Sequence, residues 1–113
     1  YPIPEVGWKV DKKIWNNRNN KMSTKVNLNQ ITTSYNVYKN RSKSSFDLLD
    51  SIQSENIYRV YPHRLFCDTL VKDRCLTHDN KNIFYYDYDH PSLKGAEMIN
   101  DLIIKEIEKL DIN

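Results

Sequence analysis

The sequence predicts an α/β fold, because helical and extended patterns follow one another along the chain. Two amphipathic helical patterns cover residues 35–52 and 91–110. Two short runs of aromatic and β-branched residues, 57–61 and 83–86, lie between them. A helix that leads directly into a strand is half of a βαβ unit, the unit from which parallel sheets are built. We therefore expect helices packed on a parallel sheet.

The first 29 residues carry little periodicity. Two X-Pro pairs in residues 1–8 favour an extended or turning backbone. Residues 9–29 are polar and aperiodic, with Trp15 and Met22 as isolated apolar positions, which predicts a long loop with at most one helical turn. Trp8 and Trp15 favour anchoring of this loop to the core, and stacking on a sugar is the alternative.

The middle of the chain has a clear helical spacing. Apolar or small residues recur every three or four positions, at Tyr35, Tyr38, Ser42, Phe46, Leu49 and Ile52. Thr33 or Ser34 is a suitable cap, and the helix is expected to end within residues 53–56. The following run, Ile57–Tyr61, ends at Pro62 and has the composition of a buried strand.

The last element is a second amphipathic helix. Pro91 suits a first helical position and Ser92 a cap. The apolar stripe of this helix is Leu93, Ala96, Ile99, Ile103, Ile107 and Leu110. Gly95 costs about 1 kcal/mol relative to alanine in a helix, so we expect it to permit a close packing contact.

Bulk composition excludes several classes of protein. At 113 residues and 39% apolar content, the chain is one small domain or a piece of a larger one. Its 17 basic and 15 acidic residues are interspersed, which argues against a nucleic-acid partner. Its apolar runs are too short to cross a bilayer. A start at Tyr1 without methionine suggests an excised segment, with any targeting signal upstream.

Cys67 and Cys75 are the only cysteines. A structural zinc site needs a second pair of ligands, which this spacing does not offer. A disulfide that closes a short polar loop fits better and suits an oxidising compartment such as a bacterial periplasm. Two reduced thiols in a cytosolic protein are the alternative.

The segment 84–96 carries the most chemistry. Asp87 lies three residues before His90, between an extended apolar run and a helix. At that spacing the carboxylate can accept the Nδ1 proton and leave Nε2 as a proton acceptor, which is half of a device that activates a nucleophile. Capping of the helix is the structural alternative. A second alternative is a divalent metal site formed by Asp87, Asp89 and His90. For His63 and His78 a surface or hydrogen-bonded role is expected.

The run from Asp87 to Ala96, D-x-x-H-P-S-x-x-G-A, resembles the last conserved block of the SGNH hydrolase family. The likeness includes, in order, the opening Tyr-Pro-Ile-Pro-Glu-Val, the helix from Tyr35, the strand before Pro62, the cysteines and Tyr85-Tyr86-Asp87. Residues 9–29 fall outside it. The variety it is most similar to is fused behind multi-spanning acyltransferase-3 membrane domains, which resemble O-antigen and cell-wall polysaccharide acetylases.

This resemblance implies that residues 1–113 are the C-terminal part of a three-layer α/β/α, flavodoxin-like domain with a parallel sheet. His90 would be the general base and Asp87 its orienting partner in acyl transfer through a serine ester, without a cofactor. The Gly-Asp-Ser block with the nucleophile and the Gly and Asn blocks of the oxyanion hole have no match here. The chain alone is therefore expected to be inactive.

The implied partners are a carbohydrate acceptor, an acyl donor, the missing N-terminal half of the domain and an upstream membrane domain. The implied location is the periplasm or the extracytoplasmic face of a bacterial inner membrane. Unpaired strand edges favour self-association of the fragment. The competing hypothesis is a small secreted, non-catalytic module that binds a glycan or a protein. That hypothesis predicts Asp87 bonded to backbone amides and His90 turned away.

Overall fold

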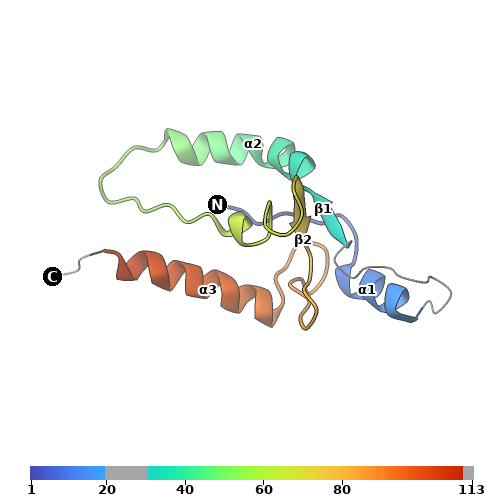
Figure 1. Cartoon of the computed structure of the whole chain (residues 1–113). Coiled ribbons are helices and arrows are strands. Elements are labelled where there is room, and N and C mark those ends of the chain that lie inside the picture. The colour runs from blue at the N-terminus through green and yellow to red at the C-terminus, as the bar shows by residue number, and fades with distance from the viewer. Residues whose placement is uncertain (20–30, 111–113) are drawn as a thin grey trace.

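The computed structural model describes residues 1–19 and 31–110 (Figure 1). The elements in order are α1 (Val10–Asn19), β1 (Thr32–Ser34), α2 (Tyr35–Ser51), a 3-10 turn η2 (Pro62–Leu65), β2 (Arg74–Leu76) and α3 (Leu93–Glu108). Figure 1 shows α2 and α3 on either side of the extended segment that leads into η2, with α1 at the end of the molecule near β1.

The helix predicted from Tyr35 is confirmed at its start, and its last residue, Ser51, lies just before the predicted end at residues 53–56. Ser34 is its N-cap, and the Ser34 hydroxyl accepts the Val37 amide at 3.3 Å. Ile52 is its C-cap. Helix ends leave carbonyls without partners, and here the Arg59 guanidinium donates to the carbonyls of Leu49 at 3.0 Å and Ile52 at 2.6 Å. Arg59 therefore ties the extended segment to the end of α2.

The buried strand predicted at Ile57–Tyr61 is wrong for the described residues. This segment is extended but belongs to no sheet, and Ile57 and Tyr58 are 38% and 62% exposed. A strand needs a neighbour for its amides and carbonyls. Within residues 1–19 and 31–110, the partners of this segment's backbone are local turns and the Tyr1 amine, which donates to the Val60 carbonyl at 3.1 Å. The parallel sheet is thus not formed by the described chain.

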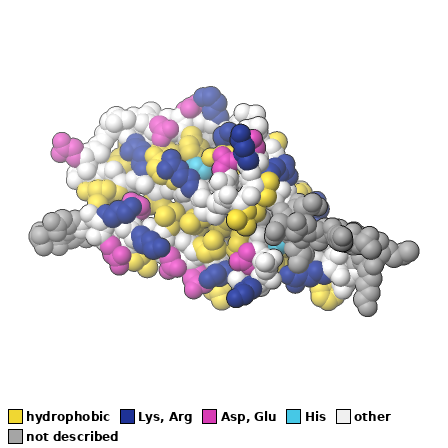
Figure 2. Space-filling view, in the orientation of Figure 1, with side chains coloured by type: hydrophobic (Ala, Val, Ile, Leu, Met, Phe, Trp, Pro, Cys, Tyr) yellow, Lys and Arg dark blue, Asp and Glu magenta, His cyan; other side chains and the backbone are white. Residues whose placement is uncertain are grey.

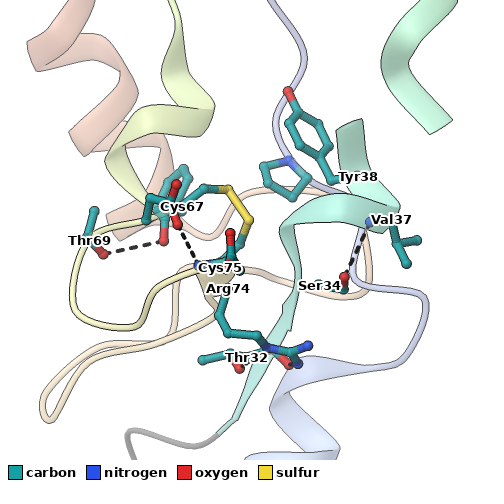
Figure 3. Close-up of a disulfide and its surroundings, with 12 residues drawn as sticks. Thr32, Ser34, Val37, Tyr38, Cys67, Thr69, Arg74 and Cys75 are labelled. Carbon is teal, nitrogen blue, oxygen red and sulfur yellow. Dashed lines mark hydrogen bonds between the residues drawn. A yellow bond between two sulfur atoms is a disulfide. The ribbon is translucent and has the colours of Figure 1, made fainter. Parts of the chain in front are cut away.

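The sheet that does form is small and antiparallel. β1 pairs with β2 in the register Thr32 with Leu76, Thr33 with Cys75 and Ser34 with Arg74. The Arg74 guanidinium reaches across to Thr32, donating to its hydroxyl at 2.9 Å and its carbonyl at 2.8 Å (Figure 3). This pairing joins the start of α2 to the cysteine loop.

Cys67 and Cys75 form a disulfide, as expected, and their Cα atoms are 3.9 Å apart (Figure 3). Asp68 and Asp73, within the loop, have left-handed backbone angles, with φ of 55° and 59°. The Asp68 carboxylate accepts the Asp73 amide at 2.6 Å, which offsets the cost of that conformation. Closing so short a loop stabilises the fold by about 2–3 kcal/mol.

The expectation of a loop over residues 9–29 is wrong for residues 10–19, which form α1. Val10 and Ile14, one helical turn apart, are both buried. Burial of this pair stabilises a helix that the polar composition of the segment does not predict. Trp8 packs partly against the core, as the anchoring prediction requires, whereas Trp15 is 68% exposed and does not join the core formed by the described residues. Residues 20–29, with Met22, lie outside the described residues.

The core surrounds the disulfide and contacts α1, both strands and the segment before the candidate site. It consists of Val6, Val10, Ile14, Ile31, Phe66, Cys67, Cys75, Leu76, Phe84 and Tyr85. The Tyr85 hydroxyl donates to the Pro4 carbonyl at 2.8 Å, so the N-terminal residues are bound to the same region. The expected extended segment 83–86 is present, with isolated bridges at Ile83 and Tyr85 rather than a strand.

The predicted last helix begins at Leu93, with Ser92 as its N-cap and Pro91 before the cap rather than at the first helical position. A Cβ at Gly95 would lie 2.2 Å from the carbonyl oxygen of Phe84. The same oxygen accepts the Ser92 amide at 2.9 Å. The close contact expected at Gly95 is therefore present, and it places the start of α3 on the segment before the site.

Much of the α3 stripe is exposed. Leu93 is 90% exposed, and Ile103 and Ile107 are 38% and 49% exposed. Figure 2 shows hydrophobic side chains in the band between the two long helices. No helix in the described part of the chain combines the length and apolarity that a membrane span requires.

Replacing Gly95 by alanine tests the close contact. Helix propensity alone would raise the free energy of unfolding by about 1 kcal/mol. The clash with the Phe84 carbonyl should instead lower it by about 1–3 kcal/mol, as measured by urea unfolding of the chain. Asn100→Ala, at an exposed position of the same helix, should raise it by about 0.5 kcal/mol through helix propensity alone. A more stable Gly95→Ala variant would contradict the packing described.

Candidate active site

Asp87 and His90 lie on a tight loop that main-chain hydrogen bonds close. The Tyr86 amide donates to the His90 carbonyl at 2.8 Å, and the Val6 amide donates to the Tyr88 carbonyl at 2.7 Å. At the exit of the loop, the Ser92 hydroxyl donates to the Ile83 carbonyl at 2.6 Å. The loop is thus held between the N-terminal segment, the core and α3.

The Asp87 carboxylate uses its two oxygens differently. Oδ1 accepts the backbone amides of Asp89 at 3.0 Å and His90 at 2.9 Å. Oδ2 lies 2.9 Å from His90 Nδ1. An ionised carboxylate can only accept, so Nδ1 must carry the proton of this bond, and Nε2 of the neutral ring is free to accept one.

These contacts set the charge of both groups. The two backbone amides, followed by the His90 ring, hold the pKa of Asp87 far below its usual value. Asp87, and to a smaller extent Asp89, raises the pKa of His90 above 6.5 by stabilising the imidazolium. The site therefore pairs an ionised Asp87 carboxylate with a His90 ring that is a stronger base than a free imidazole.

A second carboxylate lies equally close to the ring. Asp89 Oδ1 is 2.8 Å from His90 Nδ1. The bond to Asp87 satisfies the angular requirement of a hydrogen bond, whereas Asp89 Oδ1 is buried without an aligned donor among the described residues. We treat Asp87 as the hydrogen-bond acceptor, since Nδ1 has one proton and its direction favours Asp87.

The other side of the ring is open. The His90 side chain is 71% exposed, and Nε2 makes no hydrogen bond to any residue within 1–19 and 31–110. The serine nearest in sequence, Ser92, caps α3. In chemical terms the pair can accept a proton at Nε2 from a hydroxyl brought to the exposed face, and hold the resulting imidazolium.

The structure brings together Asp87 and His90 and keeps the other candidates apart from them. The binding-module hypothesis predicts Asp87 bonded to backbone amides, which is observed. It also predicts His90 turned away from Asp87, which is wrong, since Nδ1 lies 2.9 Å from Oδ2. Cys67 and Cys75 belong to the core, not to this loop. Asp87, Asp89 and His90 also offer three donor atoms within 4.8 Å of one another, the set considered above for a metal, but all three come from four consecutive residues.

The two other histidines are buried rather than exposed. His63 packs among the rings of Tyr35, Tyr38, Phe46 and Tyr61. Its burial lowers its pKa to about 4, so it is neutral at pH 7. The expected surface or hydrogen-bonded role therefore fails for His63, whose Nδ1 has no partner in the described chain. His78 is buried with Nδ1 2.9 Å from the Asp79 carbonyl, as a hydrogen-bonded role requires.

Sequence reasoning treated Asp89 only as a metal ligand and missed its approach to the ring. Its position next to His90 in the sequence was the available signal, because neighbouring residues on a closed loop can bring their side chains into contact. The contribution of Val6 to the loop had no signal in the sequence, since it arises from contact between residues 82 positions apart.

Residues 1–105 match the family described as SGNH domain (fused to AT3 domains). No curated protein matches the chain. No solved structure matches it either. The matched region includes the whole loop from Tyr86 to His90 and most of α3.

The raised pKa of His90 is testable by NMR titration of the chain. Asp87→Asn removes the charge and the acceptor that favour the imidazolium, so the pKa of His90 should fall. Glu97→Gln, which removes an exposed carboxylate on α3, is the control and should leave that pKa unchanged. An equal pKa in the Asp87→Asn variant and the wild type would mean that the pair does not form in solution.

Proposed function

This chain belongs to the family of SGNH domains fused to AT3 domains, and we propose that it supplies the base of a serine-dependent O-acyltransferase or esterase. The family connects the chain with hydrolase and acyltransferase functions. The proposal beyond this is the role of two residues, His90 as general base and Asp87 as its orienting partner. The single observation that carries it is the Asp87 Oδ2 to His90 Nδ1 bond of 2.9 Å beside an open Nε2.

The chemistry assigned to these residues is proton transfer. A serine hydroxyl supplied by polypeptide outside this sequence attacks the acyl carbonyl, and His90 Nε2 takes its proton as the carbon–oxygen bond forms. The bond to the leaving oxygen then breaks, and His90 returns the proton to that oxygen. A sugar hydroxyl or water next attacks the serine ester, again losing its proton to Nε2, and the serine oxygen leaves with that proton. Asp87 remains ionised throughout.

The proposed substrates follow from the family context. Fusion to AT3 domains supports a membrane-associated protein with an acyltransferase domain upstream. We place the reaction at the extracytoplasmic face of a bacterial inner membrane, with cell-surface polysaccharide as acceptor in an O-acetylation reaction. The Cys67–Cys75 disulfide supports this location, because such bonds persist in oxidising compartments such as the periplasm.

The proposed fold of the complete domain is a three-layer α/β/α arrangement with a parallel sheet. Residues 57–61 are extended and lie between α2 and α3, where the middle layer of such a fold would be (Figure 1). The neighbouring surface is mostly apolar. The pocket there is lined by Leu49, Ile52, Ile57, Tyr58 and Val60, together with Tyr1 and Arg59. We propose that further strands pair with this segment, and that the isolated chain self-associates through it.

Tyr58→Asp tests this arrangement. In the chain alone, at a concentration low enough to keep it monomeric, Tyr58 is 62% exposed, so the change should alter the free energy of unfolding by no more than about 0.5 kcal/mol. In the complete protein the residue would be covered, and the buried carboxylate should cost about 1–3 kcal/mol, seen as a lower midpoint of thermal unfolding. Leu70→Asp, at a 74% exposed position of the cysteine loop, should be neutral in both. Equal effects of Tyr58→Asp in the two proteins would refute the added strands.

His90→Gln in the complete protein tests the catalytic role. Loss of the base should lower kcat for hydrolysis of p-nitrophenyl acetate by about 10³-fold or more. Asp101→Asn, an exposed carboxylate of α3, is the matched control and should retain wild-type activity. A His90→Gln variant within tenfold of the wild type would remove His90 from the mechanism.

The same probe tests where the nucleophile lies. The 113-residue chain alone should release p-nitrophenolate no faster than an equal concentration of free imidazole. Saturable turnover by the chain alone, abolished by His90→Ala, would show that it contains its own nucleophile.

A further inference from the structure

We propose that Asp89 is a second positioning carboxylate for His90, able to take over the Nδ1 proton from Asp87. The proposal rests on the function assigned above to His90. It adds a residue to that function, because an Asp–His pair needs one acceptor at Nδ1 and this loop presents two.

Asp87 and Asp89 both lie within hydrogen-bonding distance of His90 Nδ1. Asp89 Oδ1 is 2.8 Å from His90 Nδ1, and Asp87 Oδ2 is 2.9 Å from it. The angle favours Asp87 in the ground state. Directing the proton to Asp89 requires the imidazole ring to rotate but not to move closer, because the two oxygens differ in direction and not in distance.

The two carboxylates differ in their other contacts. Asp87 is fixed in place by the amides of Asp89 and His90, which its Oδ1 accepts. Asp89 Oδ1 is buried and has no aligned donor among the described residues. A buried carboxylate oxygen without a hydrogen bond is unfavourable. His90 Nδ1, 2.8 Å away, carries a proton that can satisfy this oxygen once the ring is turned toward it.

A second carboxylate has two consequences for the base. When Nε2 takes a proton, the imidazolium faces two anions instead of one, which stabilises it further. When Asp87 is lost, Asp89 can keep the proton on Nδ1 and so preserve the tautomer that leaves Nε2 free. In a triad with one carboxylate, the loss of that carboxylate costs about 10⁴-fold because the tautomer is wrong.

The tautomer can be measured without any catalysis. The probe is the chain labelled with ¹⁵N-histidine, studied by NMR above the pKa of His90. Asp87→Asn should keep the proton of His90 on Nδ1, and Asp87→Asn/Asp89→Asn together should move it to Nε2. Asp87→Asn/Asp101→Asn is the matched double control and should behave as Asp87→Asn. A shift to the Nε2 tautomer in Asp87→Asn alone would overturn the proposal.

Kinetics of the complete protein give the second readout. With p-nitrophenyl acetate, Asp87→Asn should lower kcat/KM by about 10–100-fold, and the double variant by about 10³–10⁴-fold. Asp89→Asn alone should shift the acid limb of the pH profile to lower pH, which a purely structural role would not do. A single-variant loss as large as that of the double variant would overturn the role of Asp89.

The two proposals fail in different ways. If His90→Gln is fully active, the catalytic function is lost, but the tautomer measurement still decides whether Asp89 holds the ring. If Asp89→Asn changes neither the tautomer in the Asp87→Asn background nor the pH profile, the second carboxylate is refuted, while the Asp87–His90 pair and its function remain.

Discussion

The geometry of the candidate site depends on how the Asp87 carboxylate is bound. Asp87 accepts two backbone amides through Oδ1 and the imidazole through Oδ2. Asp87 does not cap α3, whose N-cap is Ser92. Its amide contacts lie within the loop itself, and the same side chain also accepts the proton of the ring. The amides fix the carboxylate and keep it ionised, so the ring meets an acceptor whose orientation is already set. The geometry of the base is therefore a property of the main chain of this loop.

The loop is stable because its surroundings leave it little freedom. The missing side chain of Gly95 lets the Phe84 carbonyl approach α3, and Phe84 and Tyr85 are buried in the core. On the opposite side, the Val6 amide holds the Tyr88 carbonyl. The core in turn packs around the disulfide. A site formed by four consecutive residues is thus supported by segments from both ends of the chain.

The sequence-based expectations that failed share a cause: each concerns a segment whose structure depends on contacts with distant parts of the chain. The run Ile57–Tyr61 has strand composition but lacks a strand beside it within the described residues, and extended backbone becomes a sheet only by pairing. Residues 10–19 looked like a loop because their apolar content is low, yet Val10 and Ile14 are enough to bind one face of a helix to the core. The pairing of β1 with β2 joins two runs of three residues, 42 positions apart, which carry no periodic signal.

The sequence by itself determined both long helices, the expected Cys67–Cys75 disulfide and the Asp87–His90 pair, because these depend on spacing, capping and short loops. Ser34 and Ser92 mark helix starts through their own side chains, and a three-residue separation is enough for a carboxylate to reach an imidazole. Only the tertiary structure decided how the loop is clamped, where His63 is buried and how close Asp89 comes to the ring. Those features depend on contacts between distant segments, and local pattern does not encode which surfaces will meet.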